Sequence, residues 1–183
     1  MPILPAEPDL FPEDRWPGGA DAPGRWWCLH TKPRQEKATA RDLRVWKISY
    51  YLPQVVHEDR TPKGRKIRSI LPLFPGYVFL RGGETERLTA LRGNRLVSVL
   101  DVSDQVGFDL DLRQIHRVLG SGLAVIPEPS VAIGSKFRVV NGPLAGLVGS
   151  VVRRGKLDRF VAIVRFLGSG ATVDLLDWQV EPI

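Results

Sequence analysis

The stretch SILPLFPGYVFLRGG, residues 69–83, places three aromatic side chains among prolines and glycines. Two prolines and a glycine interrupt the stretch before the short strand that we expect at its end. Side chains on a strand alternate between two faces, so Val78 and Leu80 share one face while Tyr77 and Phe79 share the other. We expect the aliphatic pair to pack into the core, which leaves the aromatic pair on a face that needs another role.

Strand-like and helix-like patterns alternate on both sides of this stretch. Aromatic and β-branched runs predict strands, and apolar residues at spacings of three and four predict helices. Their mixed order predicts an α+β fold, with helices on a mostly antiparallel sheet. The strands are expected at 25–32, 49–60, 61–70, 76–82 and 95–102, and the helices at 33–47, 84–94 and 109–122.

Two basic surfaces are expected within this order. The first helix should turn Ala40, Leu43 and Trp46 inward and a stripe of basic side chains outward. Residues 49–70 are typical of a two-stranded arm, interrupted at Pro53 and turning at a lysine-glycine pair. The basic residues are Arg34, Lys37, Arg41 and Arg44 on the helix, and Arg60, Lys63, Arg65, Lys66 and Arg68 on the arm.

The two ends of the chain differ from this α+β part. Residues 1–24 are acidic, contain six prolines and show no period, so we expect a disordered tail. The α+β domain is expected over 25–120, followed by a linker over 121–131. Residues 132–183 consist of short strand-like runs separated by glycine turns, which predicts a small β-barrel.

Charge is distributed unevenly along the chain, which has 183 residues and a net charge of +6. The first 24 residues hold one arginine against five acidic residues, so they carry −4 and the remainder carries +10. A basic body of this kind favours a polyanionic partner, most often nucleic acid. No apolar run approaches the roughly 18 residues needed to span a membrane. With Cys28 as the single cysteine, the reducing cytoplasm is the expected compartment.

Residue types that carry catalysis or bind metals do not cluster in the sequence. His30, His57 and His116 lie far apart, without the spacing of a metal site. Cys28 sits in an apolar strand, where an inert buried thiol is expected. With no nucleophile, base or cofactor motif, we expect neither an enzyme nor a bound cofactor or metal.

Three segments together resemble the NusG family of transcription elongation factors: WWCLHTKPRQEKATARDL (26–43), PLFPGYVFLRG (72–82) and VVNGPLAGLVGSVV (139–152). The third resembles the KOW motif, which opens the C-terminal barrel of that family. The resemblance implies a ferredoxin-like N-terminal domain over 25–120 and an SH3-like KOW barrel over 132–183. Glycine suits bends and close backbone approaches in a tight barrel, and proline presets a turn. The KOW positions concerned are Gly142, Pro143, Gly146 and Gly149.

The resemblance also implies partners. Members of the family bind the clamp helices of the largest RNA polymerase subunit and suppress pausing, and their KOW domain can recruit a small-subunit ribosomal protein or the termination factor Rho. The resemblance further implies that the protein is a monomer and that it contacts non-template DNA or nascent RNA. The clamp-facing residues would be His30, Phe74, Pro75, Tyr77 and Phe79. The nucleic-acid-facing residues would be Lys32, Arg34, Lys37, Arg41, Lys63, Arg65, Arg92 and Arg95.

Within the family, PLFPGYVF (72–79) looks closer to RfaH-type antiterminators than to the general factor. Loop 144–147 also lacks the phenylalanines that the general factor commonly shows, so a specialised antitermination paralogue is favoured. RfaH can refold its barrel into helices, but RFVAIVRF (159–166) is dense in β-branched and aromatic residues, which predicts a constitutive barrel. The alternative is a ribosome-associated RNA-binding KOW protein, which would not need the aromatics for binding.

Overall fold

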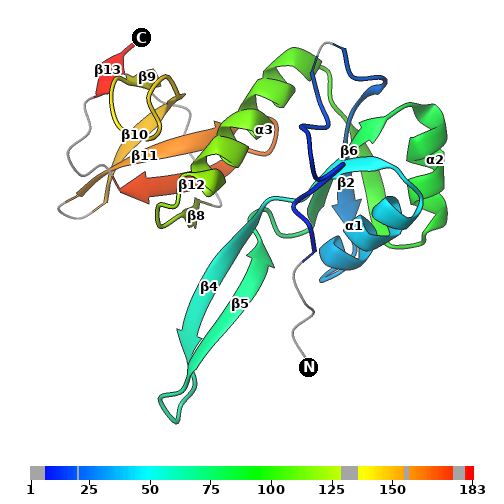
Figure 1. Cartoon of the computed structure of the whole chain (residues 1–183), viewed down its shortest axis with the longest axis horizontal. Coiled ribbons are helices and arrows are strands. Elements are labelled where there is room, and N and C mark those ends of the chain that lie inside the picture. The colour runs from blue at the N-terminus through cyan, green and yellow to red at the C-terminus, as the bar shows by residue number, and fades with distance from the viewer. Residues whose placement is uncertain (1–6, 20, 129–135, 155–156, 175–179) are drawn as a thin grey trace. The chain divides into compact units, whose positions relative to one another are not determined.

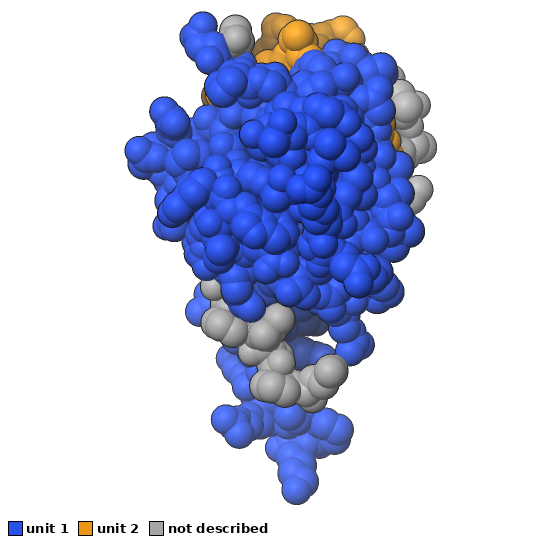
Figure 2. Space-filling model, turned by 90° about the vertical axis from the view of Figure 1, so that its right-hand side faces the viewer, with its two compact units in different colours: residues 1–105 blue, residues 106–183 orange. Residues whose placement is uncertain are grey.

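The computed structural model describes residues 7–19, 21–128, 136–154, 157–174 and 180–183. The chain divides into two compact units, residues 1–105 and residues 106–183, which Figure 2 distinguishes by colour. We call them unit 1 and unit 2 and describe each by itself. No helix within the described part of the chain is long and apolar enough to cross a membrane.

Unit 1 is built on one antiparallel sheet with the strand order β1-β3-β6-β2-β7. Strands β2 and β6 lie side by side in its centre (Figure 1), and their register sets His30 opposite Tyr77 and Cys28 opposite Phe79. The strands are β1 (Leu10–Phe11), β2 (Arg25–Thr31), β3 (Ser49–Tyr51), β6 (Tyr77–Gly82) and β7 (Leu96–Asp101).

Helices α1 (Glu36–Val45) and α2 (Glu84–Arg92) pack on one face of this sheet. Val78 and Leu80 belong to the fully buried cluster beneath them, as the alternation of the strand predicts. The predicted α+β architecture is therefore confirmed for unit 1. Trp46 does not take its expected inward position. It follows Val45, the last residue of α1, and is 39% exposed.

The N-terminal segment does not form the expected disordered tail, since its described residues are packed onto unit 1. Strand β1 pairs with β3, and Trp16 lies against the rings of Trp26 and Tyr51. The Glu7 carboxylate is buried and pairs with two arginines of α1. Proline-rich composition indicated disorder, but the few apolar and acidic residues between the prolines find specific partners on the folded body.

The predicted arm is present as a separate two-stranded sheet of β4 (Gln54–Arg60) and β5 (Lys66–Pro72) (Figure 1). Pro53 separates it from β3, and Leu73 closes its base by donating its backbone N–H to the Pro53 carbonyl at 2.8 Å. The outer half of the arm exposes its side chains from both strands. It is therefore a surface of unit 1 rather than part of its core.

Unit 2 contains a six-stranded antiparallel sheet in the order β13-β9-β10-β11-β12-β8. The expected all-β C-terminal part is confirmed within the described residues. Strand β8 lies inside the segment predicted as a linker and pairs with β12, whereas residues 129–135 lie outside the described part. The strands are β8 (Ile126–Glu128), β9 (Lys136–Val139), β10 (Val148–Arg154), β11 (Leu157–Val164), β12 (Ser169–Asp174) and β13 (Val180–Pro182).

Helix α3 (Gln105–Gly120) groups with this sheet, so the division between the units precedes the helix instead of following it at residue 120. Arg165 donates its backbone N–H and its Nε–H to the buried Asp111 carboxylate, each at 3.0 Å. Gln114 accepts the Val148 N–H at 2.8 Å. Polar side chains on one stripe of α3 therefore attach the helix to the strands, a feature that apolar periodicity does not reveal.

The KOW glycines occupy the kinds of position that the sequence indicated. Gly142 and Gly146 have φ angles of 84° and 85°, in the left-handed region that favours glycine. A Cβ added at Gly149 would lie 2.2 Å from the Val161 carbonyl oxygen, so only glycine fits this approach of β10 to β11. Pro143 follows directly after Gly142 at the start of the turn, where its fixed φ suits the bend.

Candidate functional site

The segment Phe74-Pro75-Gly76-Tyr77 forms a tight turn ahead of β6. The Tyr77 N–H donates to the Phe74 carbonyl at 3.1 Å, and Gly76 has a φ of 86°. Proline at the second position and a left-handed glycine at the third are the signature of a type II turn. The Gly76 N–H donates to the buried Glu36 carboxylate at 2.7 Å, which fastens the turn to α1.

His30 and Tyr77 form an aromatic pair directly beside this turn. Their rings are stacked, with centroids 5.3 Å apart and planes 23° from parallel. Both side chains are partly exposed and Pro75 is exposed. A Cβ added at Gly76 would lie 3.7 Å from the His30 ring, so the turn lies next to the ring. We call the surface formed by His30, Pro75 and Tyr77 the turn patch.

Phe74 and Phe79, which were expected to face a partner, are instead buried at 3% and 0% exposure. Their rings meet edge to face at 5.9 Å, and Phe79 also contacts Tyr51 at 6.4 Å. Tyr51 in turn meets Trp16 at 5.0 Å. The expectation was wrong for these two residues because their face of the sheet carries an aromatic core of its own. On this face, Tyr77 beside the turn is partly exposed.

The buried part of this aromatic face is chemically inert. Cys28 lies opposite Phe79 in the register of β2 and β6 and is fully buried. Burial raises the pKa of its thiol to about 12, so the thiolate is scarce at neutral pH. Within the described ranges, no cluster of His, Cys, Asp and Glu side chains is arranged to hold a metal ion.

Three of the basic residues expected to face nucleic acid already have partners within unit 1. Lys37 is buried and donates from Nζ to the Ile70 carbonyl at 2.6 Å, and burial lowers its pKa. Arg41 pairs with Glu7, and Arg95 donates to Asp42 at 2.5 Å. Lys37 is therefore an internal contact and not part of a nucleic-acid surface, whereas Arg41 and Arg95 are paired with carboxylates but keep side chains that are 41% and 38% exposed. The acidic partner of Arg41 lay in the segment assigned to a disordered tail.

The remaining basic residues are exposed and fall into two groups. Lys32, Arg34 and Arg92 are exposed on the body of unit 1, where Lys32 also donates to the Asn94 carbonyl at 2.7 Å. Lys63 and Arg65 are exposed near the tip of the arm. Next to the tip, the β4–β5 register sets Arg60 directly opposite Lys66. Like charges in such a pair repel one another, and a bound polyanion would relieve that repulsion.

Comparisons with known proteins found one family model and a similar solved structure. A family model described as "Transcription termination factor nusG" matches residues 24–131, from the start of β2 past β8. No protein with a curated function matches the chain. A solved structure titled "Domain interaction in Thermotoga maritima NusG" aligns with 17% sequence identity and a TM-score of 0.45. That alignment covers 87% of this chain and 97% of the other.

Proposed function

Because the chain belongs to the NusG family of transcription factors, we propose that it binds RNA polymerase through the turn patch. The stacked His30–Tyr77 pair carries this proposal, because it presents rigid aromatic surface beside an exposed proline. Aromatic side chains dominate the energetics of protein interfaces and lose little conformational entropy when they become fixed. The coiled-coil clamp helices of the largest polymerase subunit are the partner that the family resemblance implies.

Phe74 and Phe79 have a supporting part in this proposal. Their contact with each other, and the contact of Phe79 with Tyr51, support the base of the turn patch from inside the unit. Substituting either of them would change polymerase binding indirectly, by moving the turn, and would also lower stability. Contact with polymerase is accordingly assigned to His30, Pro75 and Tyr77.

Nucleic acid is the second proposed partner of unit 1. Lys63 and Arg65 on the arm, with Lys32, Arg34 and Arg92 on the body, supply exposed positive charge. Contacts of this kind with phosphates are largely independent of base sequence. They weaken as the salt concentration rises, because the release of counterions from the phosphates on binding becomes less favourable. Non-template DNA or nascent RNA held near the polymerase would supply such phosphates.

We further propose that the protein is a specialised antitermination factor whose KOW domain recruits a second partner. In the loop of unit 2 after Pro143, Leu144 and Leu147 are buried and only small residues are exposed between them. The loop therefore offers no aromatic anchor of the kind that the general factor commonly uses. A purified transcription system with an intrinsic or Rho-dependent terminator would test this part, with increased read-through as the expected result.

The polymerase contact is tested by measuring the affinity of the full chain for core RNA polymerase. Tyr77→Ala should weaken binding more than tenfold, as expected for an aromatic anchor of an interface, and Tyr77→Phe should retain most of it. Val97→Ala is a matched control, since Val97 is a 61% exposed apolar residue on β7 of the same unit. Equal binding by Tyr77→Ala and the control would refute the proposal. If ribosomes bound instead of polymerase, the ribosome-associated reading would replace it.

A further inference from the structure

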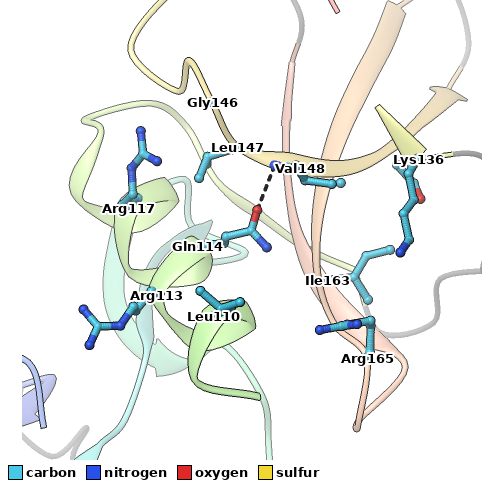
Figure 3. A pocket seen from close by; sticks show the side chains of 12 residues that line it. Leu110, Arg113, Gln114, Arg117, Lys136, Gly146, Leu147, Val148, Ile163 and Arg165 are labelled. Carbon is cyan, nitrogen blue, oxygen red and sulfur yellow. Dashed lines mark hydrogen bonds between the residues drawn. The ribbon is translucent and has the colours of Figure 1, made fainter. Parts of the chain in front are cut away.

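Unit 2 contains a cavity of about 510 Å³ between α3 and the strands β9, β10 and β11 (Figure 3). Leu110 of α3 lines one wall, and Leu147, Val148 and Ile163 line the other. This volume falls in the range of roughly 300–1,000 Å³ that is typical of small-molecule sites. The mostly apolar floor would accommodate the body of an organic ligand.

The walls of the cavity are fixed by contacts that already exist. Gln114 joins them at the top by accepting the Val148 N–H, drawn as a dashed line in Figure 3. The pairing of Asp111 with Arg165 joins them at a second point. Arg117 donates to the Ala145 carbonyl at 3.0 Å and joins them at a third. A ligand would therefore enter a preformed space, which reduces the entropic cost of binding.

Positive charge lines the cavity from both sides. Arg113 and Arg117 project from α3, and Lys136 and Arg165 come from the strand side (Figure 3). None of the described residues that line the cavity is acidic. The carboxylates that pair with Arg113 and Arg165 belong to Asp109 and Asp111, which are not among the lining residues. Since carboxylates already balance Arg113 and Arg165, the positive charge of Lys136 and Arg117 would be the main source of stabilisation for an anion in the cavity.

We propose that this cavity binds a small organic anion, with an aromatic or branched apolar body and a phosphate, sulfonate or carboxylate group. The body would rest on Leu110, Leu147 and Ile163, and the anionic group would meet Lys136 on the strand side. Charge-assisted hydrogen bonds to such groups are roughly twice as strong as neutral ones. The size of the space suits a single small molecule, whereas the exposed arm of unit 1 suits a nucleic-acid backbone.

Such a site would also let the ligand stabilise unit 2. A molecule held between α3 and the strands contacts both, and any ligand that binds only the folded form raises its stability. This inference does not rest on polymerase binding. Because its test contains no polymerase, failure of this proposal and failure of the proposed function are distinguishable.

The test uses the full chain with anilinonaphthalene sulfonate, a fluorescent anion with an apolar aromatic body. Saturable binding at one site is expected, together with a higher thermal unfolding temperature. Lys136→Gln should raise the dissociation constant about tenfold, the loss expected for one hydrogen bond between charged groups. The uncharged analogue that lacks the sulfonate should bind Lys136→Gln and the unsubstituted chain equally.

Two further variants make the outcome decisive. Arg138→Gln removes a positive charge from the same strand as Lys136 but outside the cavity lining, so it should bind the sulfonate normally. Leu110→Glu places an anion at the cavity wall on a residue that is 55% exposed, so folding should be preserved and sulfonate binding lost. Non-saturable binding, or equal binding by Lys136→Gln, Leu110→Glu and Arg138→Gln, would overturn the proposal.

Discussion

Single residues of unit 2 show how close backbone contacts select amino acids. Gly149 has its Cα against the partner strand, where even one methyl group would collide with the Val161 carbonyl and the Phe160 ring. Gly120, at the end of α3, has open space around it and an unremarkable φ. A larger side chain is therefore excluded at Gly149 and tolerated at Gly120, a difference that the sequence alone does not show.

We expect Gly149→Ala to lower the free energy of unfolding of unit 2 by about 3 kcal/mol, because the added methyl group must displace a strand. Urea denaturation followed by circular dichroism measures this loss. Gly120→Ala is the matched control and should leave stability unchanged or raise it slightly, since alanine favours helix. Similar midpoints for the two variants would contradict the role assigned to Gly149.

Cys28 should resist thiol reagents in the folded protein. Burial raises the pKa of its thiol to about 12, so the reactive thiolate is scarce at pH 8, and the residue is fully buried. The neutral thiol favours the folded state, so this contribution to stability is complete below the unfolded pKa near 9. It is lost as the pH rises from there towards 12.

The measurement is the rate of modification by an aromatic disulfide reagent at pH 8. Modification should be slow in buffer and stoichiometric within seconds in denaturant, which serves as the positive control. Rapid labelling without denaturant would show that the strand pair around Cys28 opens easily, contrary to its position between β6 and β7.

At the scale of elements, the N-terminal segment has a larger role than its composition indicates. It supplies an edge strand to the sheet and an aromatic side chain to the core. It also supplies Glu7, whose carboxylate is 4% exposed and accepts from Arg41 and Arg44. The segment thereby pairs a carboxylate with two cations of α1, although both arginine side chains stay partly exposed.

Glu7→Gln should lower the free energy of unfolding of unit 1 by about 1–2 kcal/mol. The amide keeps a hydrogen-bond acceptor but loses the charge that balances two partly exposed arginines. Chemical denaturation monitored by tryptophan fluorescence is suitable, because Trp16 and Trp26 lie close to the segment. Glu13 is exposed, so Glu13→Gln should change stability by less than about 0.5 kcal/mol. An equal change in the free energy of unfolding for both substitutions would contradict the stabilising role assigned to Glu7.

The arm should contribute to nucleic-acid affinity without contributing to stability. Replacing Lys63 and Arg65 with glutamine should weaken binding to duplex or single-stranded oligonucleotides of any sequence. The slope of log affinity against log salt should fall by about two, one for each lost phosphate contact. Lys47→Gln, another exposed substitution on unit 1, is the control. An unchanged slope in the double variant would assign the nucleic-acid contact to another surface.

At the scale of the whole molecule, α3 belongs to the β unit. Besides the pairing of Asp111 with Arg165, Phe108 meets Phe166 edge to face at 5.6 Å. The helix thus provides both polar and aromatic contacts to the strands. A division of the chain at residue 120, which the glycine at the helix end suggests, would cut through these contacts.

A fragment of residues 106–183 should therefore be more stable than one of residues 121–183, by at least about 2 kcal/mol. The shorter fragment loses the aromatic pair and the hydrogen bonds of α3. Urea midpoints of the two fragments, with circular dichroism to follow the strands, provide the comparison. Coincident midpoints would show that α3 adds nothing to the folding of unit 2.

Much of this protein was determined by its sequence alone. Alternation along β6 identified Val78 and Leu80 as core, and Pro75-Gly76 identified a turn, because both signals depend only on local backbone geometry. The arm, both helices of unit 1 and the glycine positions of the KOW loop followed from similar local rules. So did the family, through motifs that lie within single elements.

Only the tertiary structure decided which side chains remain available to a partner. Phe79 and Tyr77 share one face of a strand, yet the first is buried among aromatic rings and the second reaches the surface. Lys37 and Arg41 are equally basic in sequence, but Lys37 is buried and Arg41 is paired with a carboxylate that lies far away in the chain. Exposure and charge pairing depend on segments far apart in the chain, and local periodicity carries no information about them.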